Sequence, residues 1–325
     1  MKIVRFYECG EPDVLKVEEI ELPRAGQAEV LIKAEAIGVN YTDISHRRGV
    51  TREALRFPYT PGVEVVGTIA EVGEGVNSLP VGTKVIAMLT GGGYAEYILA
   101  PAGNVLPVPA GFDAIQAVAL PLQGLTAYHL LSSFGRLQPG ERILVHAAAG
   151  GVGTLAVQLA KAMGAGQVIA TASTQDKLDY AISLGADAGV NYAEDGWAKR
   201  VLEATDGKGA DLILEMVGGA MFNENFTCLA PFGRIMMYGA ASGQRAAIDA
   251  EKLSARCQTV TGYYAGFLGT YPQKYLSGLQ KLIGYALAGQ LKPQVNHRFP
   301  LEQAAQAHRQ MEARQTTGKI VLLPA

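Results

Sequence analysis

The sequence predicts an α/β protein with two domains, a β-rich barrel and a doubly wound parallel sheet, and three observations support this. The chain has 325 residues, more than a single hydrophobic core usually holds. Short apolar or alternating segments broken by Gly and Pro fill it up to about residue 121, whereas strand-like and helix-like segments alternate from Leu122 onward. A glycine-rich turn near residue 150 lies within this second pattern.

The amino-terminal half is expected to form the barrel. Its strand-like segments cover residues 28–37, 67–72, 84–88 and 94–99, and Gly and Pro separate them. Short strands with frequent turns are typical of an antiparallel barrel rather than of a parallel sheet.

The second half alternates strands with helices. The expected strands are residues 142–147, 168–172, 190–192, 212–217 and 235–238, and the expected helices are 124–134, 154–163, 176–184 and 197–204. This alternation predicts a parallel sheet with right-handed crossovers. After it come a helix (275–288), a strand (295–299), a helix (301–313) and a strand (319–323), which can return to the first domain.

The turn Ala148-Ala149-Gly150-Gly151-Val152-Gly153 connects an apolar strand to a helix. The first N–H groups of a helix have no partner within it and attract a pyrophosphate. Gly150 and Gly151 allow the backbone to approach that group, and Gly153 allows the helix to pack closely on its strand. A tight turn without a nucleotide is the alternative, but the βα units around it favour a dinucleotide held by Ala149, Gly150, Gly151 and Val152.

The residues after the next strand predict NADPH rather than NADH. An NAD-selective site places an acidic residue about 20 residues beyond the glycine turn, whereas this chain has Ala172-Ser173-Thr174 there. Ser173 and Thr174 offer hydroxyl groups to a 2′-phosphate, and Lys177 offers a positive charge. Two alternatives remain open, namely that Ser173 and Asp176 form a helix capping box and that Lys177 is only solvated.

Composition excludes several other classes. The formal net charge is −2, so no broad basic surface for nucleic acid is expected. The sequence has no uninterrupted run of 18 apolar residues, so no membrane helix is predicted. The first residues lack a signal-peptide pattern, and we therefore expect a cytoplasmic protein. The three cysteines, Cys9, Cys228 and Cys257, are far apart and predict neither a disulfide framework nor a clustered zinc site.

The chain resembles the medium-chain dehydrogenase/reductase superfamily, in its zinc-independent quinone oxidoreductase branch, which includes zeta-crystallin. The matching segments are residues 36–43, 61–67, 124–127, 147–153 and 184–187. The resemblance implies a GroES-like catalytic domain, formed by residues 1–121 and 266–325, and a Rossmann domain formed by residues 122–265. It also implies that Tyr192 contacts the 2′-phosphate, although packing at a strand end is the alternative.

The zinc-dependent relatives differ at the positions that bind metal. Asn40 stands where they have a cysteine, and Gly62-Val63-Glu64 stands where they have Gly-His-Glu. Their four-cysteine lobe, expected near residues 91–104, is also missing. We therefore expect no metal. A quinone accepts hydride to give a phenolate-like oxygen with a pKa of about 10, which takes its proton from water. Hydride addition to an enone gives an enolate, whose oxygen must be stabilised.

The resemblance also supplies catalytic candidates in Asn40, Tyr41, Asp43 and Thr126. It places Asn40 and Thr126 toward the nicotinamide, where Asn40 can bind the cofactor or a substrate carbonyl, unless it only forms a turn. Asp43 and Arg47 share a helical face with Asn40 if the segment is helical, and a solvated ion pair is the alternative. Tyr41 is a candidate to orient substrate or donate a proton, or it packs as an aromatic residue.

Loops at the carboxyl ends of parallel strands line a dinucleotide site. They supply the remaining cofactor-binding candidates, Val217, Tyr238, Gly239, Ala240 and Ser242. Tyr263, with Tyr264 and Phe267, is a candidate aromatic wall for a planar acceptor, with packing at a strand end as the alternative. In relatives, a C-terminal position near Lys319 can reach the cofactor.

The sequence therefore predicts an NADPH-dependent reductase of quinones. An NADPH-dependent reductase of alkenals, enones or enoyl thioesters is the first alternative. A non-catalytic NADPH-binding protein with a structural or RNA-binding role is the second, although the balanced charge argues against RNA. The expected partners are a small-molecule quinone or enone and a second copy of the chain, paired through the edge strand near residues 260–262. Neither nucleic acid nor a membrane is expected as a partner.

Overall fold

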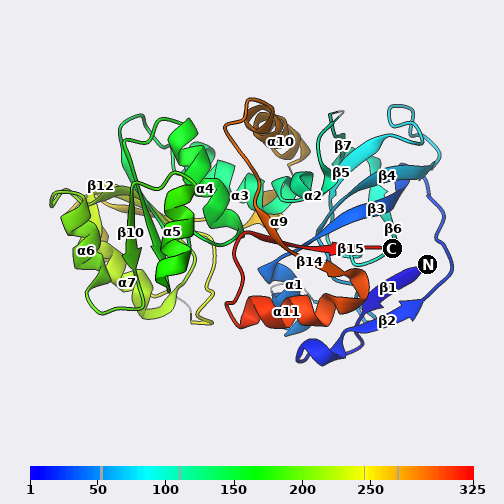
Figure 1. Cartoon of the computed structure of the whole chain (residues 1–325), viewed down its shortest axis with the longest axis horizontal. Helices are drawn as coiled ribbons and strands as arrows, with labels where there is room; N and C mark the ends of the chain where they lie inside the picture. The colour runs from blue at the N-terminus through cyan, green and yellow to red at the C-terminus, as the bar shows by residue number, and fades with distance from the viewer. Residues whose placement is uncertain (52–53, 110, 245, 269–270) are drawn as a thin grey trace. The chain divides into compact units, whose positions relative to one another are not determined.

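A computed structural model describes residues 1–51, 54–109, 111–244, 246–268 and 271–325. The chain forms two compact units. Unit 1 contains residues 1–122, 266–279 and 293–325, and unit 2 contains residues 123–265 and 280–292. Figure 1 shows the elements of each unit along the chain. The predicted fold class, a β-barrel domain with a doubly wound parallel-sheet domain, is confirmed.

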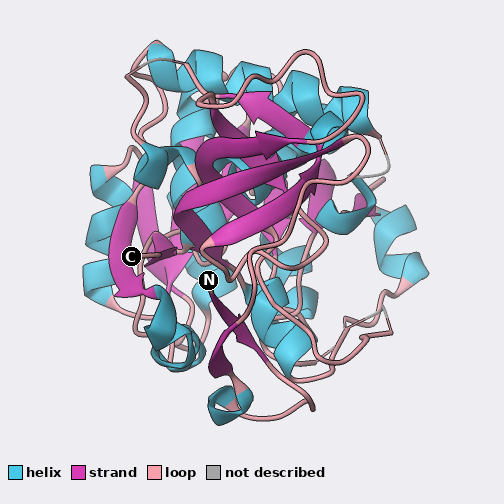
Figure 2. Ribbon diagram, turned by 90° about the vertical axis from the view of Figure 1, so that its right-hand side faces the viewer, coloured by secondary structure: helices cyan, strands magenta, loops and turns pink. Residues whose placement is uncertain are grey.

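Unit 1 is built on a curved seven-stranded sheet (Figure 2). Its strand order is β14-β15-β3-β4-β5-β7, and β6 pairs with β3 off this path. The bounds are β3 Glu29–Val39, β4 Glu64–Val72, β5 Lys84–Met88, β6 Tyr97–Pro101, β7 Val105–Pro107, β14 Val295–Pro300 and β15 Lys319–Leu323. The tail returns as expected, because β15 pairs antiparallel with the end of β3.

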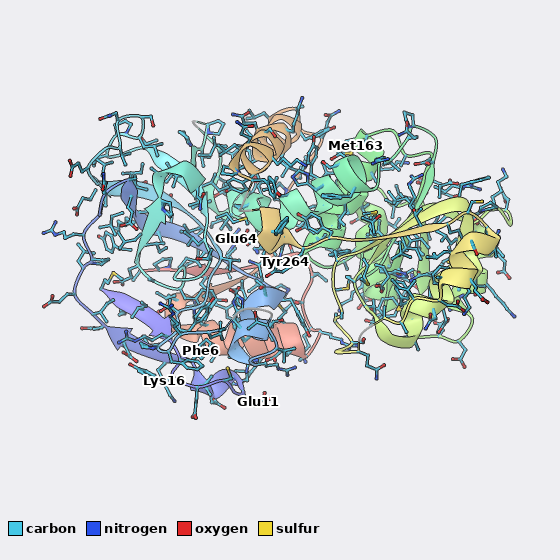
Figure 3. The ribbon with its side chains drawn as sticks, turned by 180° about the vertical axis from the view of Figure 1, so that it is seen from behind. Phe6, Glu11, Lys16, Glu64, Met163 and Tyr264 are labelled. Carbon is cyan, nitrogen blue, oxygen red and sulfur yellow. The ribbon has the colours of Figure 1, made fainter. Side chains whose placement is uncertain are left out.

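The other elements of unit 1 surround this sheet. They are β1 Lys2–Arg5, β2 Lys16–Glu19, η1 Pro12–Val14, α1 Tyr41–Arg47, η2 Ala102–Asn104, α2 Ala114–Ala117, α9 Ala265–Leu268, η5 Leu301–Gln303 and α11 Ala304–Glu312. The hairpin β1–β2 has no counterpart in the sequence prediction. Phe6 and Glu64 lie inside the unit, whereas Glu11 and Lys16 lie at its surface (Figure 3).

Unit 2 contains a six-stranded sheet in the order β10-β9-β8-β11-β12-β13, with every pair parallel. The bounds are β8 Arg142–Val145, β9 Gln167–Ala172, β10 Ala188–Asn191, β11 Ala210–Glu215, β12 Leu229–Met237 and β13 Thr259–Gly262. The strand order reverses direction between β8 and β11, which is the point where doubly wound sheets bind ligands. β8 is shorter than predicted, because Ala147 has a left-handed φ of 48° that ends the extended run.

The helices between these strands are α4 Gly151–Ala162, α5 Gln175–Ser183, α6 Trp197–Ala204, α7 Gly219–Cys228 and α8 Ala250–Ala255. Before the first strand come η3 Leu120–Gly124, α3 Leu125–His129 and η4 Leu130–Phe134, and after the last strand comes α10 Pro272–Leu287. Both η3 and α10 include residues of each unit. The predicted helix 124–134 corresponds to α3 and η4, and η3 precedes it directly; η3 and η4 are π-helical. Sequence reasoning missed α7, which begins at Gly219, the second of two glycines with positive φ. Among the helices that the structure describes, none is long and apolar enough to cross a membrane.

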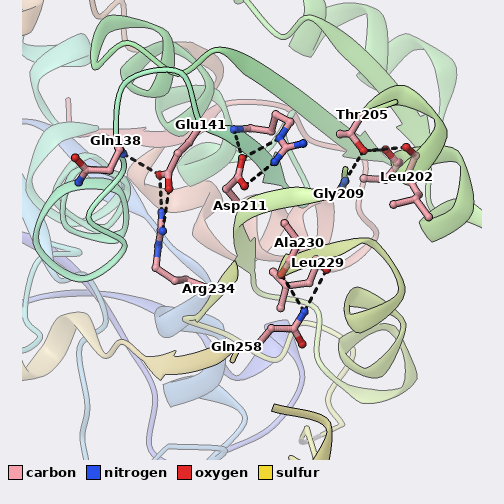
Figure 4. Close-up of polar contacts among 12 residues, drawn as sticks. Gln138, Glu141, Leu202, Thr205, Gly209, Asp211, Leu229, Ala230, Arg234 and Gln258 are labelled. Carbon is pink, nitrogen blue, oxygen red and sulfur yellow. Dashed lines mark hydrogen bonds and ion pairs between the residues drawn. The ribbon is translucent and has the colours of Figure 1, made fainter. Parts of the chain in front are cut away.

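Two ion pairs hold the amino ends of the central strands of unit 2 (Figure 4). Arg142 in β8 donates two hydrogen bonds to Asp211 in β11, at 2.9 and 2.7 Å. Arg234 in β12 donates to both oxygens of Glu141, which precedes β8. These contacts lie at the edge opposite the glycine turn, so they support the sheet rather than a ligand site.

Candidate coenzyme and acceptor site

The glycine turn of unit 2 has the geometry that a pyrophosphate requires. Helix α4 begins at Gly151 with Gly150 at its N-cap, and no side chain caps it. The N–H groups of its first turn therefore lack helical acceptors. A Cβ on Gly153 would lie 2.4 Å from the carbonyl oxygen of Ala147, so only glycine fits there. A Cβ on Gly151 would lie 2.1 Å from the side chain of Gln123.

Strand register brings two predicted phosphate contacts to one edge of this sheet. Ala172, the last residue of β9, pairs with Asn191, the last residue of β10. Ser173 and Tyr192 directly follow these two residues, and the Tyr192 N–H donates to the carbonyl of Ala172 at 3.1 Å. Lys177 follows in the first turns of α5 and is half-buried. Tyr192 also packs against the core of unit 2, so the packing role named as the alternative is present.

The alternative of a helix capping box formed by Ser173 and Asp176 is wrong. Helix α5 begins at Gln175, so its N-cap is Thr174 rather than Ser173, and the Thr174 side chain makes no cap hydrogen bond. The helix thus begins one residue later than a Ser173 cap requires. Thr174 is exposed.

Two further loops at the same edge are joined to each other. Val217 lies beyond β11, which ends at Glu215, so it belongs to the loop rather than to the predicted strand. Its carbonyl accepts the N–H of Ser242 at 2.9 Å, and the carbonyl of Met216 accepts the N–H of Ala241 at 2.8 Å. The loop that contains Tyr238, Gly239, Ala240 and Ser242 is therefore attached to the loop after β11.

Glu215 anchors this pair of loops, and sequence reasoning did not find it. Its side chain is fully buried, and Oε1 accepts the N–H groups of Val217 at 2.8 Å and Gly218 at 2.9 Å. Burial raises the pKa of the Glu215 carboxyl, and the two N–H groups oppose that rise. A carboxylate that binds backbone N–H groups holds the turn in one conformation.

Thr126 and Tyr263, two more of the predicted site residues, lie near each other in unit 2. Thr126 lies in α3, and Tyr263 follows β13. Burial raises the pKa of Tyr263 to about 12, and the nearby Thr126 hydroxyl opposes this rise. The Tyr263 ring packs edge-on against Phe134, with ring centroids 5.5 Å apart. Packing at a strand end, the alternative for Tyr263, is thus present, whereas Tyr264 and Phe267 are exposed.

In unit 1, Asn40 joins a buried cluster with Glu64 and Lys319. The Lys319 ammonium contacts the carbonyl oxygen of Val39 at 3.1 Å, Asn40 Oδ1 at 2.8 Å, and Glu64 Oε1. Asn40 Nδ2 donates to Glu64 Oε1 at 2.7 Å. Sequence reasoning named Asn40 and Lys319 separately and did not foresee their contact. Glu64 was named only as part of a motif.

Asp43 lies beside this cluster and is fully buried. It accepts the N–H groups of Asn40 at 2.8 Å and Gly62 at 2.9 Å, and Tyr94 donates to it at 3.4 Å. The Tyr94 hydroxyl also bonds His308 Nε2 at 3.0 Å. Burial raises the pKa of Asp43 to about 7. Asp43 therefore holds the turn into α1 and adds an ionisable group beside Asn40.

The alternative of a solvated ion pair between Asp43 and Arg47 is wrong. Both side chains are fully buried. Arg47 donates instead to the Gly10 carbonyl at 2.6 Å and to Glu312 in α11 at 2.5 Å. Arg47 thus connects helix α1 to the segment at Gly10 and to helix α11. Tyr41 opens α1 and is 43% exposed, so it does not share this buried environment.

The comparisons with known proteins agree with this geometry. The family model described as "Alcohol dehydrogenase GroES-like domain" matches residues 26–110, and the model described as "Zinc-binding dehydrogenase" matches residues 151–281. A quinone oxidoreductase of Pseudomonas aeruginosa is 36% identical over 99% of each chain. The chain belongs to the quinone oxidoreductase branch of the medium-chain dehydrogenase/reductase superfamily.

Two other members of this superfamily are informative. A 2-haloacrylate reductase of a Burkholderia species is 35% identical over 98% of each chain. The crystal structure of the Escherichia coli quinone oxidoreductase complexed with NADPH is 30% identical, covers 100% of each chain and has a TM-score of 0.94. The superfamily therefore includes close relatives named for two kinds of reductase.

The residues of unit 1 do not fit a zinc ion, although one matching family model is described as zinc-binding. Asn40 and Val63 provide no thiolate or imidazole, and the Glu64 carboxylate already contacts the Lys319 ammonium. Across the described ranges, no three His, Cys, Asp or Glu residues are grouped so that they could hold a metal. The Glu64 carboxylate, which is the possible ligand among these residues, is thus already paired with a buried lysine.

Proposed function

We propose that this protein is an NADPH-dependent quinone reductase that works without zinc. The observation that carries the proposal is the carboxyl edge of the parallel sheet in unit 2. There an uncapped helix begins at a glycine turn, and Ser173 and Tyr192 stand together where an NAD-selective site would have an acidic residue. The full-length relatives named quinone oxidoreductase support the same activity.

When bound, NADPH supplies a hydride from its nicotinamide ring. The pyrophosphate would be held by the N–H groups at the start of α4, and the 2′-phosphate by Ser173, Thr174, Lys177 and Tyr192. We assign the other cofactor contacts to further residues of unit 2: Ala149, Gly150, Gly151, Val152, Val217, Tyr238, Gly239, Ala240, Ser242, Tyr263 and Thr126. The Lys319 ammonium already meets three oxygens, and Asn40 is assigned to the acceptor, so neither is counted among the coenzyme contacts.

A quinone suits the polar groups near Asn40. It accepts the hydride at one end of its conjugated system and becomes a hydroquinone monoanion, which then takes a proton from water. Asn40 can donate a hydrogen bond to the oxygen on which this charge develops. We assign Asp43 to hold Asn40 in place through its backbone N–H, with Thr126 and the exposed Tyr41 as further contacts to the reactants.

Reduction of an α,β-unsaturated carbonyl compound is the second candidate, because one close relative is named 2-haloacrylate reductase. A hydride added at the β-carbon gives an enolate, and the same Asn40 N–H group can stabilise its oxygen. This reaction also requires a proton at carbon.

A homodimer fits the edge of the sheet in unit 2. β13 pairs with β12 on one side and is the last strand in the sheet order, so its other side offers backbone groups to a second copy of the chain. Sedimentation equilibrium checks this assembly. A monomer at micromolar concentration would contradict it.

One pair of measurements tests the proposed function. Stopped-flow absorbance should show NADPH oxidation that depends on added benzoquinone or naphthoquinone, and 2-alkenals run in parallel test the second candidate. Titration should show tighter binding of NADPH than of NADH. The quinone assignment fails if NADPH is consumed with alkenals and with no quinone. The coenzyme assignment fails if the two dissociation constants are equal.

A further inference from the structure

Lys319 places a basic side chain in the interior of unit 1. Burial lowers the pKa of Lys319, and the Glu64 carboxylate beside it opposes that change. The Lys319 side chain is 1% exposed, and its Nζ contacts the oxygens of Val39, Asn40 and Glu64. An ammonium has three N–H donors and no acceptor, so three surrounding oxygens satisfy it completely. A neutral amine has two N–H groups and would turn its lone pair toward one of these oxygens. The contacts therefore favour the charged form.

Glu64 completes a closed set of contacts. Its Oε1 accepts from both Lys319 and Asn40, and its Oε2 accepts the N–H of Leu122 at 2.8 Å. Gly38 in β3 leaves the room for this carboxylate, because a Cβ there would lie 2.1 Å from Glu64 Oε1. The sequence thus provides a glycine, a carboxylate and a lysine on three different strands, β3, β4 and β15, for one polar cluster.

This cluster determines which way the Asn40 amide points. A lysine only donates and an ionised carboxylate only accepts, so Oδ1 must face Lys319 and Nδ2 must face Glu64. The flipped amide would put its oxygen against the Glu64 carboxylate and its NH₂ group against the Lys319 ammonium. Both contacts would be repulsive, and both charges are buried, so solvent screens neither.

We propose that Lys319 is a positioning residue that fixes the Asn40 amide in one orientation, in which one N–H of Nδ2 donates to Glu64 and the other donates to the oxygen of the reduced acceptor. The inference rests on the proposed function, because it gives Asn40 its role toward the acceptor. The ammonium withdraws electron density through Oδ1 and makes the Nδ2 group a stronger donor. Lys319 itself does not need to touch the acceptor.

A merely structural role predicts something different. If Lys319 only neutralised Glu64, its loss would lower stability, and its effect on turnover would add to that of losing Asn40. If it acts through Asn40, its loss has little further effect once Asn40 is gone. Non-additivity therefore separates the two roles.

The test compares Lys319→Met, Asn40→Ala and the double variant, with Lys161→Met as control. Lys161 pairs with Asp187 at the surface of unit 2, so its loss should change nothing measured here. We expect kcat for benzoquinone to fall roughly 10-fold in Lys319→Met and up to about 100-fold in Asn40→Ala. The double variant should match Asn40→Ala, and KM for NADPH should stay within about 2-fold.

A second readout does not depend on turnover. In protein labelled with ¹⁵N-asparagine, the side-chain resonance of Asn40 is the one missing from Asn40→Ala. It should shift strongly in Lys319→Met and stay in place in Lys161→Met. If wild-type protein reduces no quinone, the proposed function fails, whereas this resonance still reports on the amide orientation.

Removing Lys319 alone leaves the Glu64 carboxylate buried without its cation, which can prevent folding. The variant Lys319→Met with Glu64→Gln removes both charges. Its amide oxygen can accept only one of the two donors that Glu64 accepts, Asn40 Nδ2 and the Leu122 N–H, so some stability is lost, but no charge stays buried without a partner. This variant should fold and still show the lowered kcat. The proposal is overturned if the losses from Lys319 and Asn40 add, if the resonance does not move in a folded Lys319 variant, or if only KM for NADPH changes.

Discussion

Ser173 and Tyr192 lie next to each other in register, because they directly follow Ala172 in β9 and Asn191 in β10, which are paired across the two strands. A hydrogen bond of 3.1 Å from the Tyr192 N–H to the Ala172 carbonyl keeps the two strand ends together. Ser173 and Tyr192 thus lie on neighbouring strand ends, at the sheet edge where a 2′-phosphate is expected, and Lys177 follows in α5.

Coenzyme preference should depend on Lys177. We expect Lys177→Met to weaken NADPH binding roughly 10-fold, because one charge-assisted contact to the 2′-phosphate is lost. NADH binding should change little, since NADH has a hydroxyl there. Fluorescence titration with both coenzymes measures the difference, and Lys199→Met, at an exposed position in α6, is the control. Equal losses for the two coenzymes would argue against a phosphate contact.

The glycine turn should not tolerate a methyl group at Gly153. The added Cβ would lie 2.4 Å from the Ala147 oxygen and 2.6 Å from the Ala148 Cα, so the helix would have to move off its strand. We expect Gly153→Ala to lower the free energy of unfolding by roughly 1–3 kcal/mol and to abolish NADPH binding. Urea unfolding and coenzyme titration measure the two effects.

Gly284→Ala is the matched control for that variant. Gly284 lies in α10, and a Cβ there would meet nothing within 4 Å. This substitution should be neutral or stabilising by up to about 1 kcal/mol, because alanine favours a helix. If both substitutions gave the same change in stability, the proposed close approach at Gly153 would be wrong.

His146 should make stability depend on pH. It is fully buried, bonds Thr171 and Asn225 at 2.7 Å each, and burial lowers its pKa to about 4. The ordinary pKa of histidine is 6.5, so at pH values between 6.5 and about 4 this side chain is protonated in the unfolded chain but not in the folded protein. Stability from this group is therefore complete above pH 6.5 and is lost as the pH falls through that range.

The measurement is urea unfolding of wild type and His146→Gln from pH 4.5 to pH 7.5. The stability advantage of the wild type should shrink by roughly 2–3 kcal/mol as the pH falls. Asp43 acts in the opposite direction, because its raised pKa makes the folded state bind more protons below pH 7. It is present in both proteins, so it cancels in the difference. A difference that is independent of pH would contradict the prediction.

The ion pair of Arg142 and Asp211 should contribute measurably to the stability of unit 2. Its bidentate contact is about one-fifth exposed on each side, so solvent screens part of its energy. We expect a coupling energy of roughly 1 kcal/mol from a double-mutant cycle with Arg142→Met and Asp211→Asn. The same cycle at Lys161 and Asp187, a more exposed pair, should give less. Equal couplings would show that burial and geometry do not matter here.

Local sequence patterns were enough to predict most elements of the parallel sheet. The spacing of apolar residues and the positions of glycines depend on the local backbone conformation, so they can be read from neighbouring residues. The helix 197–204 and the strand 319–323 occur within the predicted bounds. The hairpin β1–β2 and helix α7 were missed, since their short segments show no clear period. The pairing of Arg47 with Glu312 was also out of reach, because no local rule connects α1 to α11.

The sequence by itself determined the phosphate-binding turn, the missing acid after β9 and the absence of the usual zinc ligands. These depend on which residue types stand at positions close together in the chain. Only the tertiary structure decided that Lys319 would meet Asn40 and Glu64, because β15 pairs with β3 after nearly the whole chain has intervened. A buried charge has to find its partner in space, so its role is set by packing rather than by spacing along the chain.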